Sequence, residues 1–174
     1  MISQRWCLSH RADPVGRAIA DRHYNRQKVG ADQFVAPGSC LVLLTDDARA
    51  LWVTSAPLAE FVKHEWAGAW QCSLFRNEGA GVASDLIRQA LAATVAYYGP
   101  PPPLGLVTFI DPRHVRPTMV HGRPVYGWTW RRVGFVEVGT TKAQGLLAFH
   151  LPAEAFPPPM AALPRSLHGL PLFA

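Results

Sequence analysis

Six consecutive residues, from Arg76 to Gly81, have the types and spacing of an anion-binding turn, R-x-x-G-x-G. An apolar, strand-like run ends just before them, and a helix-like run begins near Val82. The first N–H groups of a helix have no partner within it and lie at the positive end of its dipole, which suits a pyrophosphate. Glycine lets the backbone approach such an anion without a Cβ in the way. The candidate donor-binding residues are Arg76, Asn77, Gly79, Ala80, Gly81 and Ser84, the last of which is alternatively a helix cap.

A second set of reactive side chains comes from three other places in the chain. Asp111 ends a strand-like run, where polar groups of α/β sheets converge on ligands, although Asp-Pro also opens turns. Tyr126 opens a predicted helix, and a phenol with its ordinary pKa near 10 is an acid at neutral pH; packing against the sheet is the alternative role. His23, Tyr24 and Asp111 together would suit iron, because imidazole and carboxylate are iron ligands.

The charge balance points to an anionic partner. Seventeen basic and twelve acidic side chains give a net charge of +5, and most of the basic residues are arginines. Arginine binds phosphate in a bidentate manner, so the balance is compatible with CoA or nucleic acid, and also with a compositional bias that implies no partner. Trp128 or Trp130 would be available to stack on a base, and core packing is the alternative. The candidate nucleic-acid contacts are Arg113, His114, Arg116, Arg123 and Arg131, with Arg132 beside them.

Length and composition favour a single globular domain. The chain has 174 residues, of which 49% are hydrophobic and 17% charged. It contains no apolar run of the roughly 20 residues that cross a bilayer, and its first ten residues lack the apolar block of a signal peptide. We therefore expect a cytoplasmic protein with no membrane partner. The three cysteines, Cys7, Cys40 and Cys72, are widely separated, which predicts reduced core thiols.

The elements that would position these residues follow from periodicity and turn signals. Asp13-Pro14 predicts a capped helix that runs to about Arg26, and the apolar spacing over 83–98 predicts a second helix that ends at the proline run 100–103. The segment 57–70 is either a short helix or irregular. Strands are predicted at 41–44, 50–53, 70–75, 104–110, 135–139 and 145–151, a short helix at 126–133, a basic loop over 113–123, and an extended or poorly ordered tail from Pro152.

The order strand, R-x-x-G-x-G, helix, strand, helix, Gly134-Phe135, strand, strand resembles the core of the GCN5-related N-acetyltransferase superfamily over roughly residues 38–151. The resemblance implies an α/β (α+β) fold with a mixed central sheet flanked by helices, a catalytic domain at 1–151 and a proline-rich tail at 152–174. It implies acetyl-CoA or a related acyl donor. Splayed fourth and fifth strands would place Cys72 to Phe75 and Phe109 to Asp111 around one cleft, and Tyr126 would protonate the leaving thiolate.

Three short strings narrow this resemblance. Arg22-His23-Tyr24, Phe75-Arg76-Asn77-Glu78 and Asp111-Pro112-Arg113 are similar to the Mom-type DNA-modification proteins of bacteriophages. That similarity implies an enzyme that adds an acyl or carbamoylmethyl-type group to adenine N6 in phage DNA, protects it from restriction, and is associated with iron. It implies DNA as partner and a flipped-out base, because an adenine amine inside a duplex cannot reach a cleft. The implied catalytic residues are Tyr126, Asp111, His23 and Tyr24.

Three other functions compete with this one. An ordinary acetyl-CoA-dependent N-acetyltransferase of a small molecule or protein amine needs the same turn but no basic face. An adenine methyltransferase is disfavoured, because no aromatic residue follows Asp111-Pro112 closely and 174 residues are few for the sheet of such enzymes. A nucleic-acid-binding protein that kept the fold without the cofactor is the non-enzymatic alternative.

Overall fold

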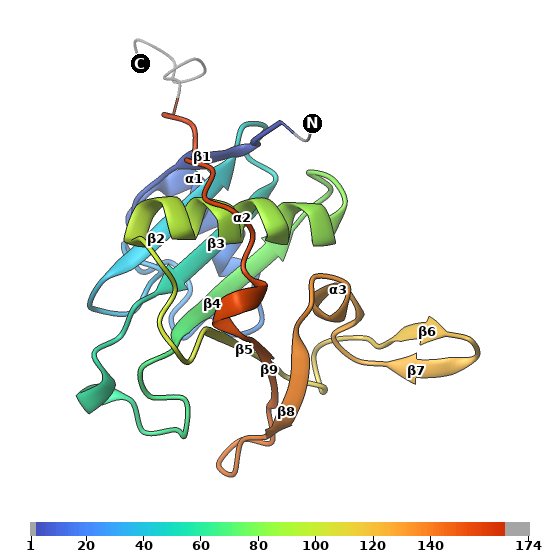
Figure 1. Ribbon diagram of the computed structural model, residues 1–174. Coiled ribbons are helices and arrows are strands. Elements are labelled where there is room, and N and C mark those ends of the chain that lie inside the picture. Colours follow the sequence, from blue (N-terminus) through green and yellow to red (C-terminus); the bar gives the residue numbers. More distant parts are fainter. Residues whose placement is uncertain (1–2, 166–174) are drawn as a thin grey trace.

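A seven-stranded mixed sheet forms the centre of the structure, a computed structural model that describes residues 3–165 (Figure 1). The strands lie in the order β1-β2-β3-β4-β5-β9-β8, and only β4 and β5 are parallel neighbours. Their bounds are β1 (Trp6–Leu8), β2 (Cys40–Thr45), β3 (Ala50–Ser55), β4 (Trp70–Asn77), β5 (Leu106–Ile110), β8 (Val136–Thr140) and β9 (Leu147–Leu151).

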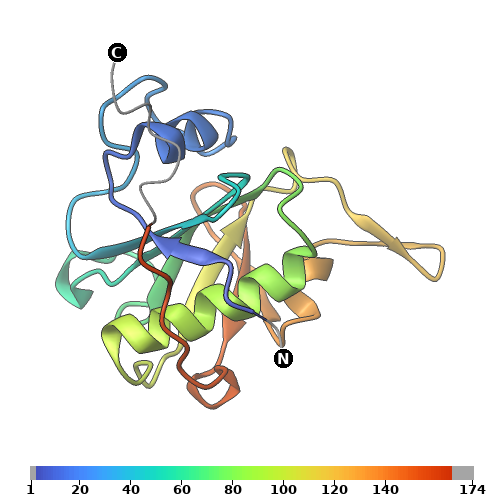
Figure 2. The same cartoon turned by 90° about the horizontal axis from the view of Figure 1, so that it is seen from above.

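The two longer helices lie on opposite faces of the sheet (Figure 2). One face carries α1 (Pro14–Asp21), and the other carries α2 (Ala83–Tyr98) with the short α3 (Trp128–Arg131) beside it. Two 3₁₀ turns, η1 (Ala59–Phe61) and η2 (Ala153–Ala155), complete the helical elements of the described residues. The predicted α+β single domain with a mixed, helix-flanked sheet is therefore confirmed.

The sheet is apolar on both faces because helices cover both. Successive side chains of a strand point to opposite faces, so β2 divides its residues between two cores. Leu41 and Leu43 pack with α2, whereas Val42 and Leu44 pack with α1. This explains why β2 and β3 are continuous apolar runs rather than alternating ones, and why the central strands are fixed in place around the parallel pair.

Several predicted elements are confirmed, and others need correction. Helix α2 spans the predicted 83–98, and the hairpin of β2 and β3 lies where it was expected. Helix α1 is shorter than predicted: Asp13 caps it by accepting hydrogen bonds from Val15 and Gly16, but it ends at Asp21, so His23 and Tyr24 follow the helix. Helix α3 begins at Trp128 and excludes Tyr126. The three cysteines are free thiols, as predicted.

The proline-rich segment does not form a separate tail as far as the structure describes it. Residues 152–165 run back across α2 to β1, where the Leu163 N–H donates to Trp6 and the Leu8 N–H donates to Leu163. Arg165 forms an ion pair with the buried Asp13. Residues 152–165 therefore pack on the domain, and residues 166–174 of the predicted tail lie outside the described residues.

A two-stranded hairpin occupies part of the predicted basic loop. It consists of β6 (Thr118–Val120) and β7 (Arg123–Val125), which form a sheet of their own. The hairpin projects from the body of the molecule in both views (Figures 1 and 2). Within residues 3–165, no helix is long and apolar enough to cross a membrane.

Candidate functional site

A cleft opens where the two parallel strands separate. β4 and β5 pair only from Trp70↔Leu106 to Cys72↔Thr108, although both strands continue beyond these residues. The Thr108 hydroxyl fixes the last pair by donating to the Cys72 carbonyl at 3.1 Å. The cavity at the divergence has a volume of about 540 Å³. Residues from both predicted segments, 72–75 and 109–111, line the cavities of this cleft, so the predicted grouping is present.

Cys72 lines the cleft but is a poor nucleophile. Its side chain is buried, and burial strongly raises the pKa of the thiol. A thiol is reactive as its thiolate, so Cys72 remains neutral and unreactive near pH 7. The chemistry of the cleft therefore depends on the oxygen and nitrogen groups around it.

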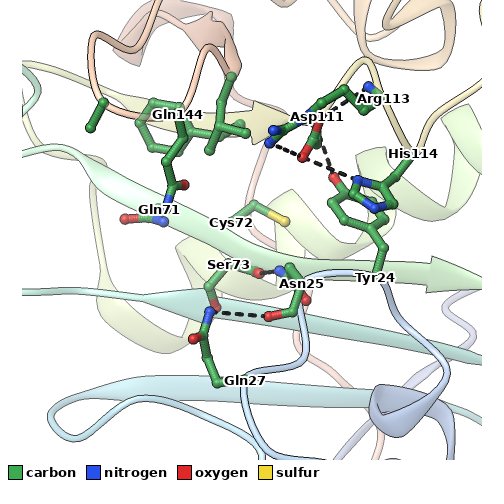
Figure 3. Close-up of a pocket in the computed structure, with 13 residues that line it drawn as sticks. Tyr24, Asn25, Gln27, Gln71, Cys72, Ser73, Asp111, Arg113, His114 and Gln144 are labelled. Atoms are coloured by element: carbon green, nitrogen blue, oxygen red, sulfur yellow. Dashed lines mark hydrogen bonds and ion pairs between the residues drawn. The ribbon is translucent and has the colours of Figure 1, made fainter.

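Tyr24 and Asp111 lie together in this cleft (Figure 3). The Tyr24 hydroxyl accepts a hydrogen bond from the Asp111 backbone N–H at 3.4 Å. The Tyr24 ring stacks with His23, at 4.5 Å between ring centroids, and with His114, at 5.4 Å, and the Tyr24 and His114 rings are nearly parallel. Burial raises the pKa of Tyr24, so its hydroxyl keeps its proton at neutral pH and can donate it to a bound molecule.

The Asp111 carboxylate is fully occupied by neighbours in the chain. It accepts hydrogen bonds from the Arg113 backbone and guanidinium at 2.7 to 3.0 Å, and its Oδ2 lies 3.1 Å from His114 Nδ1. The bonds to Arg113 hold the pKa of this carboxyl far below its usual range. The Asp111 carboxylate therefore orients the His114 ring.

The predicted iron ligand His23 is engaged within the protein. His23 Nδ1 lies 2.6 Å from the Asn25 side-chain oxygen, and a hydrogen bond to the Phe75 backbone also involves the His23 ring. Burial lowers the pKa of His23, so its ring is neutral and held within the protein. Among residues 3–165, no cluster of three His, Cys, Asp or Glu side chains could hold a metal ion. The contacts of His23 thus give no support to an iron site formed by His23, Tyr24 and Asp111, which stays a prediction.

The predicted anion-binding turn is closed by its own asparagine. Asn77 Oδ1 accepts hydrogen bonds from Gly79 N at 3.1 Å and Ala80 N at 2.9 Å, and its amide donates to the Gly81 carbonyl. Gly79 has a φ of +92°, and a Cβ there would lie 2.7 Å from the Arg49 guanidinium. Gly79 therefore makes room for Arg49, and the prediction that Asn77, Gly79 and Ala80 bind a pyrophosphate is wrong.

Arg76 is likewise engaged within the protein. Its Nε lies 2.6 Å from Glu78, which also accepts two hydrogen bonds from Arg22 at 2.7 and 2.8 Å. Hydrogen bonds from both arginines lower the pKa of Glu78 to about 2. The network ties the turn after β4 to the segment that carries Tyr24, so Arg76 has a structural role, and its predicted phosphate or substrate contact stays a prediction.

The backbone N–H groups at the start of α2 remain available to bind an anion. The N–H groups of residues 81–84 donate no hydrogen bond to another described residue. Val82 is the N-cap, so Ser84 does not cap the helix as predicted. The Ser84 hydroxyl is buried and has no partner among the described residues. Gly81 and Ser84, two of the predicted donor-binding residues, keep free hydrogen-bonding groups at the start of α2.

Tyr126 lies outside the cleft. It lines a second cavity of about 440 Å³ together with Arg131 and Glu137, which form an ion pair. Trp130 lines the cleft instead, and its ring packs against Phe75 at 5.8 Å. The prediction that Tyr126 acts at the reacting centre therefore has no geometric support, and Trp130 is half-buried and packs against the core.

The predicted basic residues divide into two groups. Arg113 and Arg131 form ion pairs with acidic neighbours, whereas the exposed Arg116 and Arg123 form none with a described residue. His114 lines the cleft. The second group adjoins or belongs to the β6–β7 hairpin and is available to an anionic partner.

Three glutamines line the cleft and were missed by the sequence analysis; the amide of Gln27 donates to the Asn25 carbonyl, and the other two have free carboxamides. Gln71, on β4, and Gln144, in the β8–β9 connection, both line the cavity and form no side-chain hydrogen bond with a described residue (Figure 3). The signal for Gln71 was present: the run from Trp70 to Phe75 alternates, which gives Gln71 and Ser73 a common face. Asn25 also lines the cleft, but its amide donates to the Ser73 carbonyl at 2.9 Å.

The cleft combines a protonated phenol, an oriented imidazole and two unpaired carboxamides. Such a set suits a planar, polar molecule that carries both hydrogen-bond donors and acceptors. No protein-family model, no curated protein and no solved structure matches this chain.

Proposed function

We propose that this chain is a DNA-modifying transferase of the Mom type, which adds an acyl or carbamoylmethyl-type group to adenine N6. The observation that carries the proposal is the hydrogen bond between Asp111 and Tyr24. These residues are separated by 87 positions, and the resemblance to Mom-type proteins implies that both belong to the site. They lie in one cleft, at the point where the two parallel strands separate. The acetyltransferase resemblance implies such a separation.

The contents of the cleft support a nucleobase as the acceptor. A glutamine side chain presents one acceptor and two donor positions, and it pairs with the N6 and N7 atoms of adenine in a bidentate manner. Gln71 and Gln144 are free for this pairing. The volume of about 540 Å³ is ample for a single base. The base would be flipped out of the duplex to enter.

The transfer requires a proton acceptor and a donor site. N6 attacks the carbon that is transferred, which is the carbonyl carbon of an acyl group or the methylene carbon of a carbamoylmethyl group; the leaving group departs with the bonding electrons, and the amine loses a proton. Asp111 holds His114 Nδ1, which leaves Nε2 as the nitrogen that takes this proton. An anionic donor would bind at the N–H groups of residues 81–84 beside Arg49, because the preceding amides are occupied by Asn77.

Mass spectrometry of nucleosides tests this proposal. DNA from cells that express the chain is digested and compared with DNA from cells that carry an empty vector. The proposal predicts an adenine nucleoside of increased mass in the first sample only. DNA with no modified adenine, together with acetylation of a protein or small-molecule amine by the purified chain, would favour an ordinary N-acetyltransferase.

A second candidate is a nucleic-acid-binding protein without transferase activity. The observation in its favour is the closed turn, in which Asn77 occupies two of the backbone amides that a donor would need. It predicts DNA binding by the purified chain with no modified nucleoside under any condition. The same digestion therefore separates it from the transferase.

A further inference from the structure

The hairpin of β6 and β7 is an isolated two-stranded ribbon. Its strands pair from Thr118↔Val125 to Val120↔Arg123, and neither strand joins the central sheet. The connecting residues, His121 and Gly122, have φ values of +48° and +74°, which is the left-handed pair of a tight two-residue turn. Isolated hairpins are only marginally stable in water, so a projecting one is an unusual feature.

The ribbon lies within the most basic part of the chain. Residues 112–136 contain five arginines, two histidines and no aspartate or glutamate. Arg116 precedes β6 and Arg123 begins β7, and both are exposed without an ion pair to a described residue. A polyanion is the partner that this charge attracts.

An exposed apolar side chain lies between these cations. Met119 is 64% exposed although it belongs to a strand, and its cross-strand neighbour is Pro124. Proteins that bend DNA insert methionine, proline and similar side chains between base steps. A two-stranded ribbon also fits within a DNA groove.

We propose that the β6–β7 ribbon enters a groove of duplex DNA, with Arg116 and Arg123 on phosphates and Met119 inserted at the base step beside the target. This inference rests on the proposed function, which requires an extruded base. The cleft and the ribbon are close in sequence, because His114 lines the cleft and β6 begins at Thr118. The Met119 side chain of the ribbon would thus occupy the gap that the target base leaves in the stack when it is flipped into the cleft.

The first experiment measures affinity for a duplex oligonucleotide over a range of salt concentrations. The double substitution Arg116→Ser and Arg123→Ser should lower affinity roughly tenfold for each arginine and reduce the slope of log K against log salt by about one unit for each. Lys63→Ser, at an exposed position outside the β6–β7 ribbon, is the control and should change neither quantity.

The second experiment separates insertion from electrostatic binding. A duplex that carries 2-aminopurine becomes more fluorescent when this base leaves the stack. The natural chain should produce the increase, and Met119→Ala should abolish most of it while affinity stays within about threefold, because the phosphate contacts remain. Phe61→Ala, which truncates another exposed apolar residue, should leave the increase intact.

The outcomes distinguish this inference from the proposed function. If cellular DNA is modified but the ribbon variants bind and unstack DNA as the natural chain does, the ribbon inference fails alone. If the ribbon variants lose binding and unstacking while no modified nucleoside is found, the ribbon inference holds and the transferase proposal fails.

Discussion

The Asp111 backbone N–H donates a hydrogen bond to the Tyr24 hydroxyl across 3.4 Å, and this contact joins the end of β5 to the segment after α1. Because the backbone supplies the proton of this bond, the hydroxyl proton of Tyr24 remains available to the cleft. The Asp111 side chain meanwhile holds Arg113 and His114. One residue thus positions a phenol through its backbone and an imidazole through its carboxylate.

The closure of the turn by Asn77 predicts a loss of stability on truncation. Asn77→Ala removes one acceptor of two hydrogen bonds and one donor, so we expect the free energy of unfolding to fall by about 1–2 kcal/mol. Asn77→Asp keeps the acceptor oxygen and should lose less. Urea unfolding measures both, and equal stability of all three proteins would show that the turn does not depend on Asn77.

The Glu78 network predicts a stability contribution that depends on pH. The pKa of Glu78 in the folded protein is about 2, below its ordinary 4.5, so folding favours the ionised form. The contribution is therefore complete above about pH 5 and declines as the pH falls toward 2. Glu78→Gln should be less stable than the natural chain at pH 6, with the difference vanishing near pH 2.

Urea unfolding at several pH values measures this difference. Glu60→Gln, at an exposed position in η1, is the matched control and should follow the natural chain throughout. A difference between Glu78→Gln and the natural chain that stays constant from pH 6 to pH 2 would contradict the assigned ion pairs with Arg22 and Arg76.

The unpaired carboxamide of Gln71 predicts a role in selecting the base. Gln71→Leu keeps a similar size but leaves the base without its partner, so the yield of modified adenine should fall about tenfold or more. Gln33→Leu, at an exposed position outside the cleft, should leave the yield unchanged. Quantitative nucleoside mass spectrometry at matched protein levels measures both, and an unchanged yield for Gln71→Leu would remove this residue from the site.

Local patterns predicted the regular elements, because their signals are short-range. The spacing of Leu86, Ala90 and Ala93 placed α2, and its end at the proline run followed from the missing N–H of proline. The β6–β7 hairpin was not predicted from the sequence, because its strands have only three residues each and Pro124 weakens the strand pattern. The signal that was overlooked is His121-Gly122, a pair suited to a left-handed turn.

The site was harder to predict because its contacts are long-range or involve competing partners. The resemblance located Tyr24 and Asp111, but no spacing rule joins residues 87 positions apart. The turn was misinterpreted for a different reason: Asn77 precedes Gly79 by two residues, and an asparagine side chain often bonds backbone N–H groups two or three positions ahead. That rule would have predicted a closed turn. Only the structure shows that these N–H groups bond to the Asn77 side chain and so are not free for a ligand.

The most direct test of the account is the amount of modified adenine in DNA from cells that express the natural chain, Tyr24→Phe or Tyr97→Phe. Tyr24→Phe keeps the ring stacked on His114 but removes the hydroxyl in the cleft, whereas Tyr97 is exposed and does not line the cleft cavities. We predict a modified adenine nucleoside with the natural chain and with Tyr97→Phe, and at least a tenfold lower amount with Tyr24→Phe at equal protein levels. Equal amounts with all three chains would contradict the role of Tyr24, and no modified adenine with the natural chain would contradict the proposed function.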